Sequence, residues 1–315
     1  MRLSPLLIVL TATTRLAAQD LPPYIPSNPV LTSRSALYAQ PVVPQGRGWR
    51  TRVVLDYANA VEVTTASDGR DYVFDAETLA GDLWVTHDLS PKVFLIGDLS
   101  IRGGYDGALD GFLNWYHDLI GIQVPARNQR TPNIFVWDYT LPDDQHIHNP
   151  RPGTFLGDIR LGAGLRFGQS QLVAAFTLPT ATAEAWGREV IGTSLAFTTR
   201  VVDNSRVVVE GGATVGWTPT TGSMAAFQKS VFVGGQLATR WRFSGRQALF
   251  ATMWAQSPNW QNTGFGALDA AEVTLDFGGL IKFGAKWPEI QIGMTEDLLP
   301  RGPAVDAGFK LGVRF

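Results

Sequence analysis

Apolar and polar residues alternate over most of the chain that follows Trp49. In the segment 158–167, for example, the odd positions are all apolar and the even positions are Arg, Asp or Gly. Successive side chains of a β-strand point to opposite faces, whereas the period of a helix would mix the two sets. The pattern therefore predicts strands that have one apolar face and one polar face.

Twelve runs of this kind follow one another along the sequence. They lie at residues 50–63, 74–89, 92–104, 156–168, 171–179, 190–203, 206–218, 229–243, 246–256, 269–283, 287–296 and 306–315. Short connections built from turn residues alternate with longer ones, the longest being residues 105–155. This arrangement is typical of barrels in the outer membrane of Gram-negative bacteria. We expect an all-β fold, a single transmembrane, antiparallel, up-and-down β-barrel over residues 49–315 with short periplasmic turns and long extracellular loops.

A soluble β-sandwich is the competing interpretation, because its strands also alternate apolar and polar residues. Its exposed face would be rich in Lys, Glu and Thr, and its turns would not alternate in length. Charged residues make up 17 % of this chain, against roughly 25 % in soluble domains. The composition therefore favours the barrel.

Composition also excludes several classes of function. Beyond the N-terminal residues, the chain has no run of 18 apolar residues without a charge, so transmembrane helices are excluded. The net charge of −2 provides no basic surface for nucleic acid. The chain has no Cys, so disulfides and cysteine-based metal sites or nucleophiles are excluded. No glycine-rich loop joins a strand to a helix, and we expect no cofactor.

The N-terminal 48 residues precede the alternating pattern. Residues 1–18 are predicted to be a secretory signal peptide, with Arg2 before an apolar stretch and Ala17 and Ala18 near the cleavage site. Residues 19–48 are rich in proline and have no periodicity. We expect this segment to be an irregular periplasmic arm or a plug in the mouth of the barrel.

The last predicted strand, 306–315, ends on an aromatic residue. Phe309, Leu311, Val313 and Phe315 share its apolar face. An aromatic end to an alternating strand resembles the signal that the barrel-assembly machinery reads, and the closing strand must pair with the first to leave no open edge in lipid. We expect the cell outer membrane as the location, with that machinery, periplasmic chaperones, outer-membrane lipids and lipopolysaccharide as partners.

The long loop 105–155 contains a stretch with apolar residues at helical spacing. A short helix is predicted near residues 108–122, with Phe112, Trp115 and Leu119 on it beside His117. The helix would either fold into the lumen as a plug or cap the barrel from outside. Later in the loop, His146 and His148 form a weak candidate for a metal site, with solvated side chains as the alternative.

Several short segments, in this loop and elsewhere in the chain, match motifs known from other proteins. The resemblance rests on the stretch 110–122 with the segment 125–130, on Gly157-Asp158 leading into a strand, on 295–298 and on 304–306. These segments are similar to motifs of the family known as domain of unknown function 3187. The usual forms have Pro-Asp where this chain has Val305-Asp306, and Leu-Pro where it has Ile122 to Pro125. The resemblance implies a barrel and no established activity.

Charged residues on the polar face are predicted to line the lumen. They are Arg52, Asp98, Arg102, Asp158, Arg160, Arg166, Arg200, Arg206, Glu210, Arg240, Arg242, Glu272, Asp276, Lys282, Lys310 and Arg314. These groups would either line a narrow polar pore with a slight preference for anions or pair across the interior and fill it. The filled or plugged lumen is slightly favoured.

Three functions remain open on the sequence. The first is a narrow polar channel for small solutes. The second is a non-transporting barrel that binds at the cell surface or acts as an envelope scaffold. The third and least favoured is an outer-membrane lipid hydrolase using Ser257, which has no His on its own or on the neighbouring predicted strand. We expect no enzymatic activity and assign no catalytic residue. Trp254 and Trp260 around Ser257 are predicted to belong to an aromatic girdle with Trp186 and Trp217.

Overall fold

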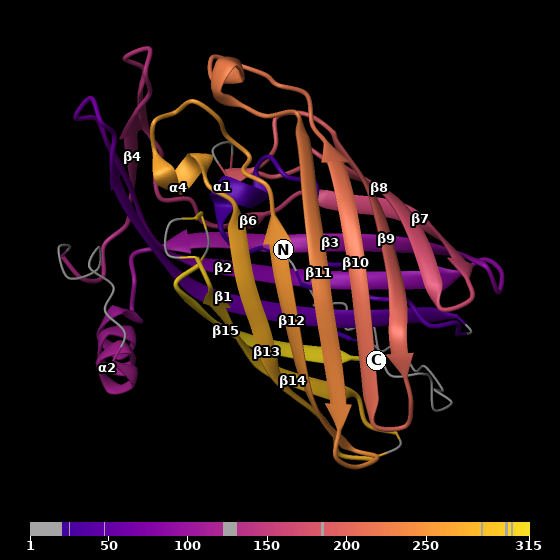
Figure 1. Ribbon diagram of the computed structural model, residues 1–315. Helices are drawn as coiled ribbons and strands as arrows, with labels where there is room; N and C mark the ends of the chain where they lie inside the picture. Colours follow the sequence, from indigo (N-terminus) through magenta and orange to yellow (C-terminus); the bar gives the residue numbers. More distant parts are fainter. Residues whose placement is uncertain are drawn as a thin grey trace, which may run out of the picture.

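The computed structural model describes residues 21–24, 26–46, 48–121, 131–183, 186–284, 286–299, 302–303 and 305–315. A closed antiparallel barrel of twelve strands forms most of it, as the alternation predicted (Figure 1). Its strands are β1 Trp49–Thr65, β2 Asp71–Asp88, β3 Val93–Tyr105, β7 Ile159–Phe167, β8 Ser170–Leu178, β9 Gly192–Asp203, β10 Val207–Trp217, β11 Val231–Arg242, β12 Gln247–Gln256, β13 Glu272–Lys282, β14 Glu289–Asp297 and β15 Ala307–Arg314.

The smaller elements lie in the connections. They are β4 Val136–Thr140, β5 His146–His148, β6 Gly153–Leu156, the helices α1 Pro29–Thr32, α2 Asp110–Ile120 and α4 Gly266–Asp269, and the 3-10 turn η2 Ala225–Phe227. None of the helices in the described part of the chain has the length and apolar character that would let it cross a membrane.

The sheet closes where the first barrel strand meets the last. β1 pairs with β15 from Arg52 opposite Arg314 to Asn59 opposite Ala307, and with β2 on its other side. This pairing leaves neither edge strand open, which is the condition for a sheet in lipid. The connections between β2 and β3, β7 and β8, β9 and β10, β11 and β12, and β13 and β14 lie at one end, called here the short-turn rim. The opposite end is called the long-loop rim.

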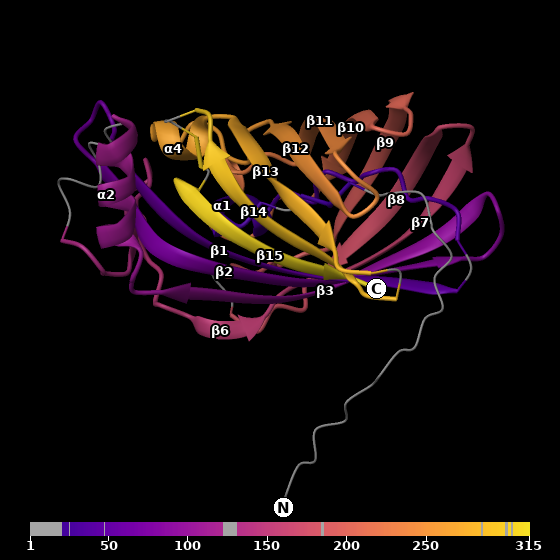
Figure 2. The same cartoon turned by 90° about the horizontal axis from the view of Figure 1, so that it is seen from below.

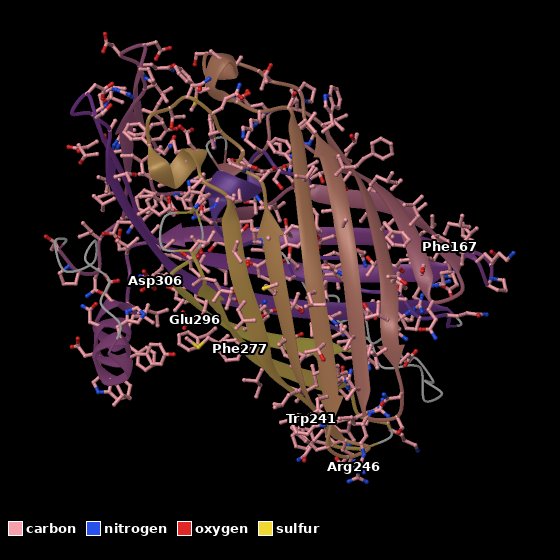
Figure 3. All side chains as sticks on the ribbon, in the orientation of Figure 1. Phe167, Trp241, Arg246, Phe277, Glu296 and Asp306 are labelled. Carbon is pink, nitrogen blue, oxygen red and sulfur yellow. The ribbon has the colours of Figure 1, made fainter. Side chains whose placement is uncertain are left out.

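The two faces of the wall differ as the alternation predicted. Large apolar side chains such as Phe167, Trp241 and Phe277 are exposed on the outside (Figure 3). Their strand neighbours point inward, where Arg160, Glu210 and many others are buried. An apolar outer band around a polar interior is the pattern of a barrel that spans the outer membrane, and the protein is located there.

One predicted strand, 156–168, is wrong in its first part. The strand is interrupted at Gly157 and Asp158, so that β3 pairs with β6 near the long-loop rim and with β7 below it. A Cβ atom on Gly157 would lie 2.1 Å from Oγ of Ser100, so only glycine lets the two strands approach here. Asp158 therefore belongs to neither β6 nor β7.

Candidate functional site: the lumen and its arm

Residues 21–24 and 26–46 run through the barrel interior as an irregular hairpin, called here the arm (Figure 2). Nearly all of its described residues are buried. Leu21 packs against inward residues near the short-turn rim such as Val208 and Leu280, and α1 lies at the far end of the excursion. Tyr24 and Ala39 form an antiparallel bridge that joins the outgoing and returning limbs. The arm therefore enters and leaves on the same side of the barrel.

The returning limb is held by polar side chains of four wall strands. Gln40 accepts hydrogen bonds through its carbonyl from Thr198 Oγ1 at 2.7 Å and Gln236 Nε2 at 3.0 Å. The amide of Val42 donates to Glu210 Oε2 at 2.7 Å, and that of Val43 donates to Gln171 Oε1 at 2.8 Å. These contacts satisfy backbone groups that have left water and have no ladder partner.

Two arginines fasten the far end of the arm, a pair called here the latch. Arg188, from the loop between β8 and β9, donates to the carbonyls of Arg34 at 2.7 Å and Thr32 at 3.1 Å, and also to that of Ser35. Arg34 in turn donates to the carbonyls of Pro219 and Lys229, both at 3.0 Å. The latch joins the arm to the loops after β8 and β10.

Burial of the latch also affects its ionisation. Burial, with the nearby Arg188 charge as a second cause, lowers the pKa of Arg34 to about 10. The pKa of Arg188 is lowered as well, chiefly by burial. Both guanidinium groups still carry a charge at neutral pH, so their hydrogen bonds to carbonyls are charge-assisted.

Asp158, predicted to line the lumen, instead holds the loop that carries the latch. Its carboxylate accepts hydrogen bonds from the amides of Thr180 at 2.9 Å, Ala181 at 3.0 Å and Arg188 at 3.0 Å. Its Oδ2 lies 3.7 Å from Arg188 Nε. The carboxylate therefore contacts Arg188 through both its backbone amide and its side chain.

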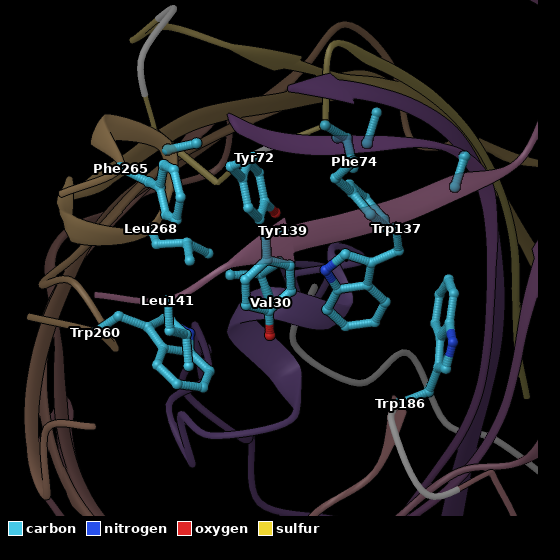
Figure 4. Packing of buried hydrophobic residues seen from close by; sticks show 14 of the residues in the cluster. Val30, Tyr72, Phe74, Trp137, Tyr139, Leu141, Trp186, Trp260, Phe265 and Leu268 are labelled. Atoms are coloured by element: carbon cyan, nitrogen blue, oxygen red, sulfur yellow. The ribbon is translucent and has the colours of Figure 1, made fainter. Parts of the chain in front are cut away.

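An aromatic cluster surrounds the tip of the arm near the long-loop rim (Figure 4). Val30 of α1 packs in a buried cluster with Tyr72, Phe74, Trp137, Tyr139, Leu141, Trp186, Trp260, Phe265 and Leu268. Trp186 and Trp260 were predicted to belong to an outer girdle, and Trp254 is likewise buried, at 1 % exposed. Only Trp217 of that predicted set is exposed, at 50 %.

Most of the predicted lumen charges face inward and form ion pairs. Arg240 and Arg314 both contact Glu289, at 2.8 and 3.3 Å. Lys310 lies 2.9 Å from Asp276 and 3.5 Å from Asp56. Further pairs are Arg102 with Asp82, Arg200 with Glu210, and Arg166 with Asp88. Ion pairs thus connect different strands across the interior, and the attraction within each pair offsets part of the free-energy cost of burying its charges.

The remaining predicted lumen residues have other environments. Arg160 is 1 % exposed, and its guanidinium lies 3.8 Å from the centre of the Tyr38 ring of the arm. Asp98 lies opposite it in the ladder, Arg52 is buried, and Glu272 accepts a hydrogen bond from Tyr24 at 3.2 Å. Arg242 and Lys282 stand at the ends of β11 and β13. Arg206 is exposed in the turn before β10, so its predicted place in the lumen is wrong.

Several partners of these charges were missing from the predicted set. Asp88 and Glu289 share strand parity with residues that face inward, so strict alternation from Trp84 and Gln291 identifies both. The arm residues Tyr24, Arg34 and Tyr38 have no such signal, because the arm has no periodicity. Only the tertiary structure places them in the lumen.

A recess of about 770 Å³ opens at the short-turn rim. The returning limb of the arm forms one side of it through Val42 to Gln45, and the wall contributes Lys92, Arg166 and Arg200. Asp203 is the acidic residue of its lining. The recess therefore presents more positive than negative side chains to an entering solute.

The predicted plug helix does not enter the lumen. α2 lies outside the ring of strands in both views of the ribbon (Figures 1 and 2). Phe112, Trp115 and Leu119 are exposed at 44, 58 and 68 %, whereas His117 is buried. The plug interpretation for these residues is wrong, because the arm, not α2, fills the barrel.

The predicted assembly-signal residues lie on the outer face of β15. Phe309, Leu311 and Phe315 are 37, 51 and 50 % exposed, and Val313 has the same strand parity and is half-buried. β15 lies between β1 and β14, as a closing strand must.

The two remaining candidate sites are the His146 and His148 pair and Ser257. His146 and His148 are exposed and contact one carboxylate, Asp138, at 3.5 and 3.1 Å. Within the described ranges, no group of three or more His, Asp or Glu residues has the arrangement of a metal site. Ser257 Oγ accepts a hydrogen bond from the Val233 amide at 3.0 Å. All four histidines are among the described residues, and none of them forms a hydrogen bond with it there.

The fold resembles that of a solved outer-membrane channel. The structure is similar to the COG4313 outer membrane channel from Pseudomonas putida F1, at 15 % identity and a TM-score of 0.53, over 86 % of this chain and 96 % of that one. The Ralstonia pickettii toluene transporter TbuX is matched at 8 % identity and a TM-score of 0.43, over 86 and 90 %. Among curated proteins, none matches the sequence.

The sequence itself is matched by a family model over most of its length. The family is described as protein of unknown function DUF3187, and the match covers residues 48–315. That range includes the whole barrel and excludes the arm. The chain belongs to the DUF3187 family of outer-membrane β-barrels.

Proposed function

We propose that the protein is an outer-membrane channel for small polar solutes, narrowed by the arm. The observation that carries the proposal is the way in which the arm is held. Its returning limb accepts hydrogen bonds from Thr198 and Gln236 and donates to Glu210 and Gln171, and it is not held by continuous sheet pairing. Contacts of this kind are individually weak in net terms and exchange with water, so the arm can shift while the barrel stays closed.

The charges at the short-turn rim support a preference for anions. Lys92, Arg166 and Arg200 line the recess with Asp203. Arg166 and Arg200 are also paired with Asp88 and Glu210, so the preference rests mainly on Lys92. Side-chain charges at a constriction favour the passage of the opposite charge. We therefore expect small anions to enter more readily than small cations.

Conductance in planar lipid bilayers tests the proposal. The full-length protein should give small single-channel steps with a reversal potential shifted toward that of the anion. Arg188→Ala should enlarge the steps, because the latch no longer fixes the arm. Arg206→Ala removes an exposed arginine from a turn and should leave the steps unchanged.

A non-transporting barrel that binds at the cell surface is the second candidate. One observation favours it: the aromatic cluster with Trp137, Trp186 and Trp260 packs against the arm tip near the long-loop rim. This candidate requires that neither the full-length protein nor folded Arg188→Ala conducts. Silence in both, with heat-modifiable migration showing an intact barrel, contradicts the channel.

A further inference from the structure

Helix α2 turns Asp110 and His117 toward the barrel together with Leu113, and it turns three large apolar side chains away from the barrel. The exposed Asp118 stands at the edge of this apolar face. Asp110, Leu113 and His117 are buried at 4, 0 and 6 % exposure, and their spacing places them on one face. Phe112, Trp115 and Leu119 lie on the opposite face and are exposed. A helix at the surface of a soluble protein has the reverse arrangement.

The buried face of α2 meets polar groups on the outside of the wall. Glu77, on the outward face of β2, accepts hydrogen bonds from the amides of Ala108 and Leu109 at the start of the helix and from the Tyr57 hydroxyl. Asn59 of β1 donates to Asp110 Oδ1 at 2.8 Å. Without the helix, these groups would interrupt the apolar outer wall with polar side chains that lipid cannot satisfy.

The far half of the helix also lies near a carboxylate of the barrel. His117 Nε2 lies 3.8 Å from Asp306 Oδ1, just before β15. Asp306 and Glu296 stand on the side of the barrel that faces α2 (Figure 3). Polar contacts at both halves fix which face of the helix points away from the protein.

The exposed face of α2 continues the lipid-facing surface of the barrel. The ring of Phe112 lies 5.8 Å from that of Phe309 and 5.7 Å from that of Trp115. Phe309 shares the outer face of β15 with Leu311. One unbroken apolar surface thus runs from the wall onto the helix.

We propose that α2 is embedded in the hydrocarbon of the outer leaflet, with Phe112, Trp115 and Leu119 in contact with lipid acyl chains. The segment that follows β3 is then a membrane-embedded cover over the polar patch of Asn59 and Glu77, and not a loop in water. An amphipathic helix with this division of residues binds at the boundary of headgroups and acyl chains. The proposal holds whether or not the barrel conducts.

The absence of cysteine in the chain permits a direct test with single nitroxide labels. Leu119→Cys and Trp115→Cys in the full-length protein, in phosphatidylcholine–phosphatidylglycerol vesicles, are labelled and compared by power-saturation EPR. Both labels should collide often with oxygen and rarely with a water-soluble nickel chelate, as a label at Leu311→Cys on the outer wall does. Asp143→Cys, in an exposed turn, provides the aqueous reference.

The opposite result overturns the proposal. Nickel accessibility at 115 and 119 equal to that at 143 would place the helix in water. Dipolar broadening between labels would assign the apolar face to a second copy of the chain and would equally contradict lipid contact.

A second measurement keeps the test independent of the label. A membrane-impermeant maleimide should react with Leu119→Cys at least about tenfold more slowly than with Asp143→Cys. Equal rates contradict the proposal. Heat-modifiable migration confirms that each variant is folded.

Discussion

The arm and helix α2 are bound to opposite sides of the same wall, and both are bound through polar groups. Inside, the latch residue Arg188 and wall residues such as Glu210 satisfy the arm backbone. Outside, Glu77 satisfies the start of α2. The two differ in what they present away from the wall. Nearly all described residues of the arm are buried, whereas α2 exposes Phe112, Trp115 and Leu119.

That difference indicates what surrounds each segment. A segment within a polar lumen needs partners for its backbone, and burial of its apolar residues follows from packing against the opposite wall. A segment outside the wall needs an apolar surface if its surroundings are lipid. Polar contacts with the wall therefore do not show whether a segment lies in the lumen or outside the barrel. The side chains that the segment turns away from the wall do show it.

Removal of the latch should have the largest effect on the inner segment. Arg188→Ala deletes charge-assisted bonds to three arm carbonyls and should weaken docking of the arm tip by about 3 kcal/mol. Limited proteolysis between Thr32 and Leu37 should speed up by about 100-fold, since about 1.4 kcal/mol corresponds to a factor of ten. The matched variant Arg206→Ala should be cut at the rate of the unmodified protein. An equally resistant Arg188→Ala protein would mean that the arm does not depend on the latch.

Loss of the outer anchor should have the next largest effect. Glu77→Ala leaves the amides of Ala108 and Leu109 and the Tyr57 hydroxyl without their acceptor, at a cost of about 2 kcal/mol. Hydrogen exchange over 108–113 should accelerate while the strands stay protected. Asp143→Ala, a carboxylate removed from an exposed turn, serves as the control. Unchanged exchange at α2 would show that Glu77 does not anchor it.

The aromatic contact between wall and helix should contribute less. Phe309→Ala removes the ring that Phe112 meets at 5.8 Å and should weaken the attachment of α2 by about 1 kcal/mol beyond the loss of lipid-facing area. Leu311→Ala, two residues further along the same outer face, loses lipid-facing area but no aromatic contact. Urea unfolding in vesicles, with hydrogen exchange at α2 as the local readout, compares the two. Identical hydrogen exchange at α2 in both variants would show that the aromatic contact does not stabilise its attachment.

The smallest effect is expected at a loop hydrogen bond that binds neither segment. His148→Ala breaks a contact of 3.1 Å between an exposed imidazole and Asp138. Such exposed pairs contribute about 0.5 kcal/mol or less. Urea unfolding in vesicles should show no resolvable change, and the conductance should stay the same. A shift comparable with that of Glu77→Ala would mean that the β4–β5 hairpin supports the barrel.

Strand parity in the sequence was sufficient to predict the wall but not what lies against it. Arg160, Glu210 and Lys310 could be assigned to the interior because each lies between apolar neighbours that must face lipid. The same rule failed at Asp158, where Gly157 breaks the strand, and at Arg206, which belongs to a turn. The helical spacing of α2 predicted its existence but not its side of the wall.

The arm was beyond such rules for a physical reason. Its conformation is set by side chains far away in the sequence, such as Glu210 for Val42 and Asn259 for the carbonyls of Val30 and Leu31. Because the arm has no periodic pattern of apolar residues, its own sequence does not indicate which distant residues it contacts. Its abundant prolines indicated only that it is neither strand nor long helix.

The hairpin course of the arm has a consequence for biogenesis. Both limbs of the arm meet the barrel at the short-turn rim, and the bridge between Tyr24 and Ala39 joins the two limbs. The arm can therefore enter the barrel as a preformed hairpin, without passing a chain end from one rim to the other. The arm can enter a barrel in which β1 and β15 have already paired. The hairpin course therefore permits the sheet to close before the arm fills its interior.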